Sequence, residues 1–142
     1  ALRKNGDVFL HQERFVDSLL EKHGMAKCKG NSTVQVDKLP LEPDPPTAAV
    51  LKQLQGFSGE FNWLATRTRP DMSYYTSLLA SSCTKFSAWS IELANKILRF
   101  LAANKGQGIL ITVAGDLTEL LGWTDAGYAG ADTKSQSGLI VT

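Results

Sequence analysis

The sequence contains few of the residues and runs that mark zinc-bound, disulfide-linked or membrane-spanning proteins. It has two cysteines, Cys28 and Cys83, and two histidines among 142 residues. These four residues share no short metal-ligand spacing, so no metal site is predicted, and the distance between the cysteines favours separate reduced thiols over a disulfide. No apolar run reaches the roughly 18 residues that a membrane-spanning helix needs, so the chain is not expected to span a membrane by itself.

The beginning of the chain also lacks a recognisable targeting segment. Its first residues, ALRKNGDVFL, contain no apolar stretch of the kind that a secretory signal requires. We therefore expect an intracellular protein, in a compartment that the sequence does not specify. Because the chain does not begin with Met, we also expect that further sequence precedes Ala1.

Neither sign of charge is in strong excess. The net charge is +1 at pH 7, and 43% hydrophobic with 20% charged residues is typical of a globular domain. The distribution is uneven, because residues 46–110 carry seven basic and three acidic side chains, whereas residues 111–142 carry one and four. The positive segment is compatible with a nucleic-acid backbone nearby, and also with an ordinary solvated surface.

Apolar spacing predicts helices first and strands last, which is an α+β order. Helices are expected from Gln12 to a stop at Gly24, and over residues 47–55, 56–66, 70–79 and 88–104. Residues 26–46 contain most of the prolines and no sustained period, which predicts a linker or an extended surface arm. Alternating β-branched runs predict strands at 108–113, 119–125 and 137–142.

Four motifs follow one another along the chain: HQERFVDSLLEKHGMAKC (residues 11–28), FNWLATRTRPDMSYYTSLLA (61–80), ANKILRFLAANKGQGI (94–109) and TDAGYAGADTKSQSGLIV (124–141). Taken in this order, they resemble copia-type LTR retrotransposon polyproteins. The second is similar to the Thr-Arg-Pro-Asp region that follows the polymerase, and the fourth to the opening of the tethered RNase H domain. The resemblance extends over nearly the whole chain, with the motifs in the order that the family has.

The resemblance implies a fold and a domain order. Residues 1–106 would be the end of the reverse transcriptase, a helical connection-like bundle with residues 26–46 as a linker. Residues 107–142 would be the first strands of an RNase H-like domain, forming a truncated antiparallel sheet.

The resemblance also implies that this chain alone is not an enzyme. The family's polymerase motif, Tyr-x-Asp-Asp, is absent from the sequence. Asp125 matches the first RNase H carboxylate, but the Glu and later Asp residues of that pattern would follow Thr142. Two-metal hydrolysis needs several carboxylates around cations about 3.5–4 Å apart. Asp125 is therefore expected to be a vestigial site residue, with Mg²⁺ needed only by the complete parent enzyme and no cofactor in this chain.

Departures from the family pattern lie beside this carboxylate. Gly127 and Tyr128 stand where the family usually has an acidic or small residue followed by Trp. Asp132 lies in a turn-like stretch, where Asp commonly forms local hydrogen bonds. None of these three residues is expected to supply the missing metal ligands.

Basic side chains are the remaining candidates for nucleic-acid contact. The resemblance implies such a role for Arg67, Arg69, Lys96 and Arg99. The alternative for the Thr-Arg-Pro-Asp motif is structural, with Asp71 capping the next helix or pairing with an arginine. The three tryptophans similarly allow base stacking or, as is more usual in apolar stripes, burial in the core.

Two functions remain open. The chain is either a catalytically incomplete polyprotein segment that links polymerase to RNase H and contacts an RNA/DNA hybrid, or a recruited, non-catalytic structural subunit. The expected partners are the rest of the polyprotein with its hybrid in the first case. In the second they are unrelated subunits of a larger assembly, docked on exposed apolar strand edges.

Overall fold

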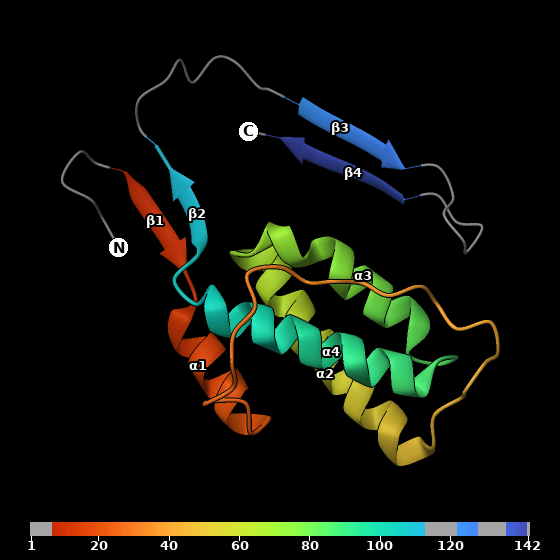
Figure 1. The fold of residues 1–142 in the computed structure, drawn as a ribbon. Helices are drawn as coiled ribbons and strands as arrows, with labels where there is room; N and C mark the ends of the chain where they lie inside the picture. The colour runs from red at the N-terminus through yellow and green to blue at the C-terminus, as the bar shows by residue number, and fades with distance from the viewer. Residues whose placement is uncertain (1–6, 113–121, 128–135, 142) are drawn as a thin grey trace.

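The computed structural model describes residues 7–112, 122–127 and 136–141 (Figure 1). Helices occupy the middle of this part of the chain and short antiparallel strands flank them, so the predicted α+β class is confirmed. The elements are β1 (Val8–His11), α1 (Glu13–Lys22), α2 (Ala48–Arg67), the 3-10 helix η1 (Pro70–Met72), α3 (Ser73–Ser82), α4 (Ser87–Ala103), β2 (Gly108–Ile111), β3 (Gly122–Gly127) and β4 (Gln136–Val141). None of these helices is long and apolar enough to cross a membrane.

Helix α1 ends at a glycine, as the sequence predicts. Gly24 has a φ of 68°, in the left-handed region that favours glycine. Its N–H donates to the carbonyl of Glu21 at 3.0 Å, and the Met25 N–H donates to that of Leu20 at 2.7 Å. These two bonds form a Schellman motif, which fixes the direction in which the chain leaves the helix.

Helix α2 is continuous where two helices were predicted. The break expected at Gly56 is wrong, because the helix runs through Gly56 and Gly59, both of which face open space. Each glycine costs about 1 kcal/mol in a helix interior. Burial of Phe57 and Phe61 on the same helix contributes roughly 1.5–3 kcal/mol for each side chain, which outweighs that cost.

Helix α4 lies at the centre of the bundle. It contacts α1, α2 and α3, and it matches the predicted helix at residues 88–104 to within one residue at each end. Its predicted apolar stripe is buried: Leu93, Ala94, Ile97, Leu98 and Leu101. The core also contains Cys83 as a free thiol, and Cys28 is free as well, as the sequence predicted.

The first ribbon joins strands from opposite ends of the helical region. β1 and β2 pair antiparallel, with Val8 opposite Ile111 and His11 opposite Gly108. The sequence analysis grouped β2 with the later strands, whereas the structure pairs it with the segment before α1. The reason is that α1 packs against α4, so the start of α1 and the end of α4 lie at the same end of the bundle (Figure 1).

The second ribbon contains the strands that were compared with RNase H. β3 and β4 pair antiparallel, as predicted, with Asp125 opposite Gly138. Within the described residues they form a separate two-stranded sheet. Tyr128 and Asp132 lie outside the described residues, and the RNase H-like origin of the ribbon stays a prediction.

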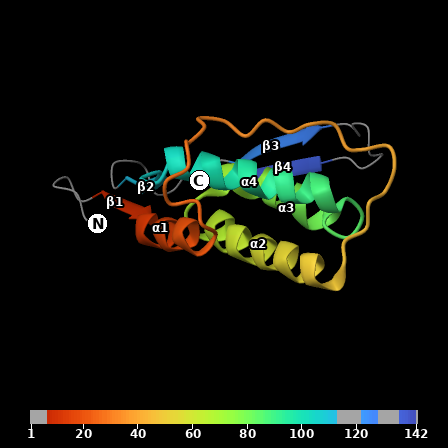
Figure 2. The same cartoon turned by 60° about the horizontal axis from the view of Figure 1, so that its bottom comes forward.

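Residues 26–46, here called the arm, form the extended surface arm that was one of two predicted alternatives. The arm runs along one side of α3 and α4, and α2 lies on the other side (Figure 2). The Asn31 N–H donates to the carbonyl of Arg99 at 3.0 Å, and the Asp44 N–H to that of Lys85 at 2.8 Å. Val34 is buried between these two attachments.

Candidate nucleic-acid interface

Arg69 is buried in the interior of the bundle. Its side chain is only 2% exposed. It donates from Nε and Nη2 to the two carboxylate oxygens of Asp71, at 3.0 and 2.8 Å, and from Nη1 to the carbonyl of Asn104 at 2.9 Å. The last of these bonds satisfies a carbonyl at the end of α4, where a cation is favoured. The structural interpretation of the Thr-Arg-Pro-Asp motif therefore accounts for Arg69, which has no exposed surface for a phosphate.

The same motif contacts the beginning of the chain. The Thr68 hydroxyl donates to the side-chain carbonyl of Gln12 at 2.8 Å, so two of the four recognised motifs meet directly. A hollow of about 430 Å³ lies between this motif and the β1–β2 ribbon. Arg69, the arginine among the described residues that line this hollow, is already paired with Asp71.

Arg67 is exposed, on helix α2. Its guanidinium carbon lies 4.7 Å from the centre of the Trp63 ring, a cation–π contact at one-turn spacing. The core interpretation is wrong for Trp63, whose 47% exposure follows from its place on the flank of the apolar stripe, and is confirmed for Trp89, which is buried. The side chain of Trp123 is not described. Arg67 does not line the hollow that contains Lys96 and Arg99.

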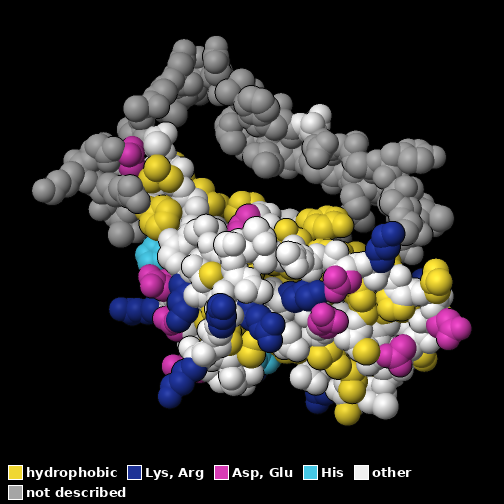
Figure 3. Space-filling view, in the orientation of Figure 1, with side chains coloured by type: hydrophobic (Ala, Val, Ile, Leu, Met, Phe, Trp, Pro, Cys, Tyr) yellow, Lys and Arg dark blue, Asp and Glu magenta, His cyan; other side chains and the backbone are white. Residues whose placement is uncertain are grey.

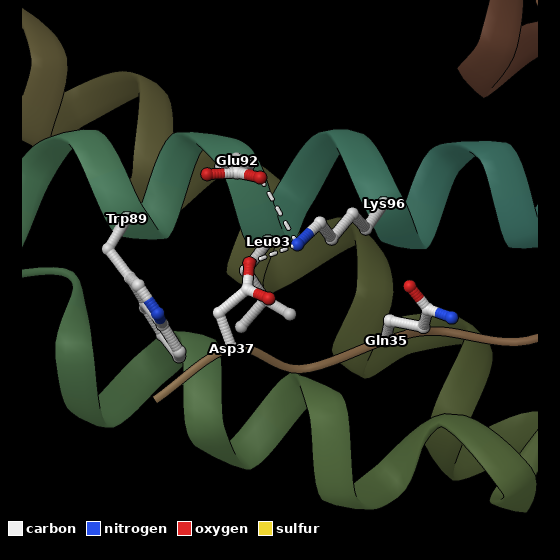
Figure 4. A pocket seen from close by; sticks show the side chains of 6 residues that line it. All are labelled: Gln35, Asp37, Trp89, Glu92, Leu93 and Lys96. Carbon is white, nitrogen blue, oxygen red and sulfur yellow. Dashed lines mark hydrogen bonds and ion pairs between the residues drawn. The ribbon is translucent and has the colours of Figure 1, made fainter. Parts of the chain in front are cut away.

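Lys96 lies on α4 but is paired with two carboxylates. Its ammonium group donates to Asp37 of the arm and forms an ion pair of 3.1 Å with Glu92, one turn earlier on α4 (Figure 4). The hydrogen bond to Asp37 raises the pKa of Lys96 above its ordinary value. The groove beside Trp89 in this view has no room for a ligand. Lys96 therefore fastens the arm to α4 and contributes little free positive charge.

Arg99 is the candidate that faces solvent beside an open space. A hollow of about 430 Å³ between the arm and α4 is lined by Asn31, Ser32, Thr33, Gln35, Lys96 and Arg99. In the part of the chain that the structure describes, the Arg99 side chain forms no ion pair or hydrogen bond. Figure 3 shows Lys and Arg side chains gathered over α1 and the C-terminal half of α4, with acidic side chains among them. The structure thus brings together two of the four predicted residues, Lys96 and Arg99.

Four polar residues of this hollow were missed by the sequence analysis. Asn31, Ser32, Thr33 and Gln35 lie in the arm, which has no periodic pattern that would assign them a face. The polar run Asn-Ser-Thr inside a proline-rich segment was the available signal. Nothing in that run indicates that it lies beside Arg99, because the contact depends on where the chain crosses α4.

Asp125 lies on β3 opposite Gly138 of β4, and its side chain lies outside the described part of the structure. Among the residues whose side chains the structure describes, no three His, Cys, Asp or Glu come together as metal ligands. A single carboxylate does not suit the two-cation chemistry of RNase H. The need of the complete parent enzyme for Mg²⁺ stays a prediction.

The chain is similar in sequence to a transposon polyprotein and to a mitochondrial protein. The chain is 28% identical over 150 aligned positions to a retrovirus-related Pol polyprotein from transposon RE1 of Arabidopsis thaliana, covering 99% of the chain and 10% of that protein. It is 25% identical over 140 positions to an uncharacterized mitochondrial protein of the same plant, AtMg00810, covering 92% of the chain and 53% of that protein.

These similarities confirm the resemblance that the motifs indicated. The chain is a segment related to copia-type retrotransposon Pol polyproteins. It spans about a tenth of the length of the first relative and about half of the second. No protein-family model and no solved structure matches the chain.

Proposed function

We propose that this chain is the segment of a retrotransposon polyprotein that joins the polymerase to the RNase H domain and contacts the RNA/DNA hybrid between them. It has no complete catalytic site of its own, and its partners are the remainder of the polyprotein and the hybrid. The observation that carries the contact is the hollow beside Arg99. Phosphate and sugar contacts come from arginine together with Ser, Thr, Asn and Gln side chains, and these line the hollow.

Neighbouring charges limit how strong this contact can be. Lys96 is balanced by Asp37 and Glu92, so Arg99 supplies the free positive charge at the hollow. The whole chain carries only +1. We therefore expect weak, sequence-independent affinity, with a dissociation constant of about 10⁻⁴–10⁻⁶ M at physiological salt.

Fluorescence anisotropy with a labelled RNA/DNA hybrid, at several salt concentrations, tests the proposal. Changing Arg99→Glu should weaken binding and make the salt dependence shallower by about one phosphate contact. The matched control is Lys52→Glu, the same change at an exposed position on α2, which should have a smaller effect. If the unaltered chain does not bind the hybrid, or if both variants bind equally well, the contact is not at this hollow.

A second candidate function is a recruited structural subunit. It is favoured by the β1–β2 ribbon, which exposes Leu10, Leu110 and Ile111 at 41%, 45% and 50%. One relative is moreover described as a mitochondrial protein rather than as a polyprotein. The native mass of the endogenous chain, with identification of everything that co-migrates at fixed stoichiometry, separates the two. Unrelated proteins at fixed stoichiometry favour the subunit, and nucleic acid or polyprotein peptides favour the first proposal.

A further inference from the structure

The hollow between the arm and α4 is lined mainly by uncharged hydrogen-bonding groups. Four of its six lining residues are uncharged: Asn31, Ser32, Thr33 and Gln35. Within the described residues, none of these four side chains forms a hydrogen bond, so their donors and acceptors are available to a ligand. All four residues are exposed.

The charges around the hollow cancel. Arg99 and Lys96 are positive, but the two carboxylates held by Lys96, those of Asp37 and Glu92, are negative. A site for several phosphates needs a surplus of positive charge, because phosphate oxygens are acceptors that carry a full negative charge. The hollow can therefore accommodate one phosphate at Arg99, and the rest of its wall suits a neutral ligand.

The uncharged groups of the hollow can form hydrogen bonds with a sugar hydroxyl. The side-chain amides of Asn31 and Gln35 have an oxygen that accepts and an NH2 group that donates, and the hydroxyls of Ser32 and Thr33 do both; a phosphate uses only the donors, whereas a sugar hydroxyl uses donors and acceptors. A ribose 2′-hydroxyl is both donor and acceptor, and it is the group by which a protein distinguishes RNA from DNA.

The wall of the hollow is held in place before any ligand binds. The Asn31 N–H is bonded to the carbonyl of Arg99, and Asp37 is bonded to Lys96. A Cβ at Gly30 would lie 2.8 Å from the backbone nitrogen of Ala103, so the arm passes against α4 at van der Waals contact. Gln35 and Lys96 line both this hollow and the neighbouring groove beside Trp89, and Figure 4 shows Gln35 on the arm and Lys96 on α4 at the same end of that groove. The four polar residues therefore lie between two points at which the arm is fastened.

We propose that this hollow recognises the RNA strand of the hybrid, with the polar residues of the arm on a ribose 2′-hydroxyl and Arg99 on an adjacent phosphate. This inference rests on the proposed function, since it assigns a strand and a chemical group to the hybrid contact. It predicts that the chain prefers duplexes in which one strand is RNA.

The test compares three duplexes of one sequence in the anisotropy assay: the RNA/DNA hybrid, the DNA duplex, and a hybrid whose ribonucleotides carry 2′-fluorine. Fluorine keeps the RNA-like sugar conformation but cannot donate a hydrogen bond. The unaltered chain should bind the true hybrid roughly fivefold more tightly than the 2′-fluoro hybrid, the effect of one or two hydrogen bonds. The double variant Ser32→Ala with Thr33→Val should reduce that preference to less than twofold, because it removes both hydroxyls from the lining of the hollow.

Two controls separate this inference from the proposed function. Thr84→Val removes a hydroxyl from an exposed position outside the hollow and should keep the preference. Arg99→Glu should weaken binding to all three duplexes. Equal binding of the true and 2′-fluoro hybrids by the unaltered chain would overturn the inference while leaving the hybrid contact intact. Failure of the unaltered chain to bind any duplex would overturn both.

Discussion

Helix α4 is capped by a residue far away in the sequence, and its removal should destabilise the protein measurably. Phe86, at the N-cap position, provides no side-chain hydrogen bond. Instead, the Ala88 N–H donates to the Asp44 carboxylate at 3.0 Å, and the Ser87 N–H donates to the Asp44 carbonyl at 2.7 Å. The arm thus supplies both an acceptor and a negative charge to the N-terminus of the central helix.

The magnitude follows from the side-chain part of this cap. Asp44→Ala removes the carboxylate but keeps the carbonyl, so it loses one capping bond, worth about 0.5–2 kcal/mol, and a favourable charge–dipole term of about 0.3–1 kcal/mol. Because Asp44 is exposed, we expect a total near 1.5 kcal/mol. Asp44→Asn keeps an acceptor and loses only the charge, which should cost about 0.5 kcal/mol.

Urea unfolding followed by circular dichroism measures these changes. With an m-value of about 1.5 kcal/mol/M, Asp44→Ala should lower the midpoint by about 1 M. The matched control is Glu42→Ala, the same loss of charge at an exposed position two residues earlier, which should change stability by less than about 0.5 kcal/mol. If Asp44→Ala and Glu42→Ala have equal midpoints, the arm does not cap α4 and the reasoning is refuted.

Three further changes test other parts of the bundle. Arg69→Ala should cost about 2–4 kcal/mol in unfolding free energy, because it removes the buried guanidinium that pairs with Asp71 and leaves a carbonyl at the end of α4 unsatisfied; Arg69→Lys keeps the charge but not the bidentate contact and should recover only part of that cost, and a urea midpoint unchanged by Arg69→Ala would contradict this role. Burial would raise the pKa of Glu60, but hydrogen bonds from Lys22 and His23 outweigh it and lower that pKa. The contribution of Glu60 is therefore present above its usual value of 4.5 and lost as the pH falls below it, and Glu60→Gln should flatten an acid titration of stability followed by circular dichroism. Gly30→Ala should lower the thermal midpoint, since its Cβ would lie 2.8 Å from the backbone of α4, whereas Gly59→Ala on α2, which meets open space, should not lower it.

Local patterns in the sequence were enough to predict the helices. The stripe from Leu93 to Leu101 has the period of a helix buried along one face, and Gly24 after α1 can adopt a positive φ without steric cost. The break expected at Gly56 was wrong because glycine propensity is a small local term. The buried phenylalanines of α2 outweigh it only once α3 and α4 are present.

The surroundings of the four predicted interface residues could not be predicted from the sequence. Arg67, Arg69, Lys96 and Arg99 are equivalent as positive charges, yet the structure buries Arg69, pairs Lys96 with carboxylates and leaves Arg99 beside the hollow. These outcomes depend on which residues lie opposite each side chain. The partners of Lys96 and Arg69, Asp37 and Asn104, are 59 and 35 residues away.

The sequence by itself determined the α+β class, the stripe of the central helix and the relation to copia-type polyproteins, because each depends on residues close together in the chain or on motifs in a fixed order. Only the tertiary structure decided that β2 pairs with β1, that the arm caps and crosses α4, and that its polar residues meet Arg99. These are contacts between distant segments. They form because burial of the apolar face of α4 brings those segments together, and no local pattern in the sequence predicts which segments will meet.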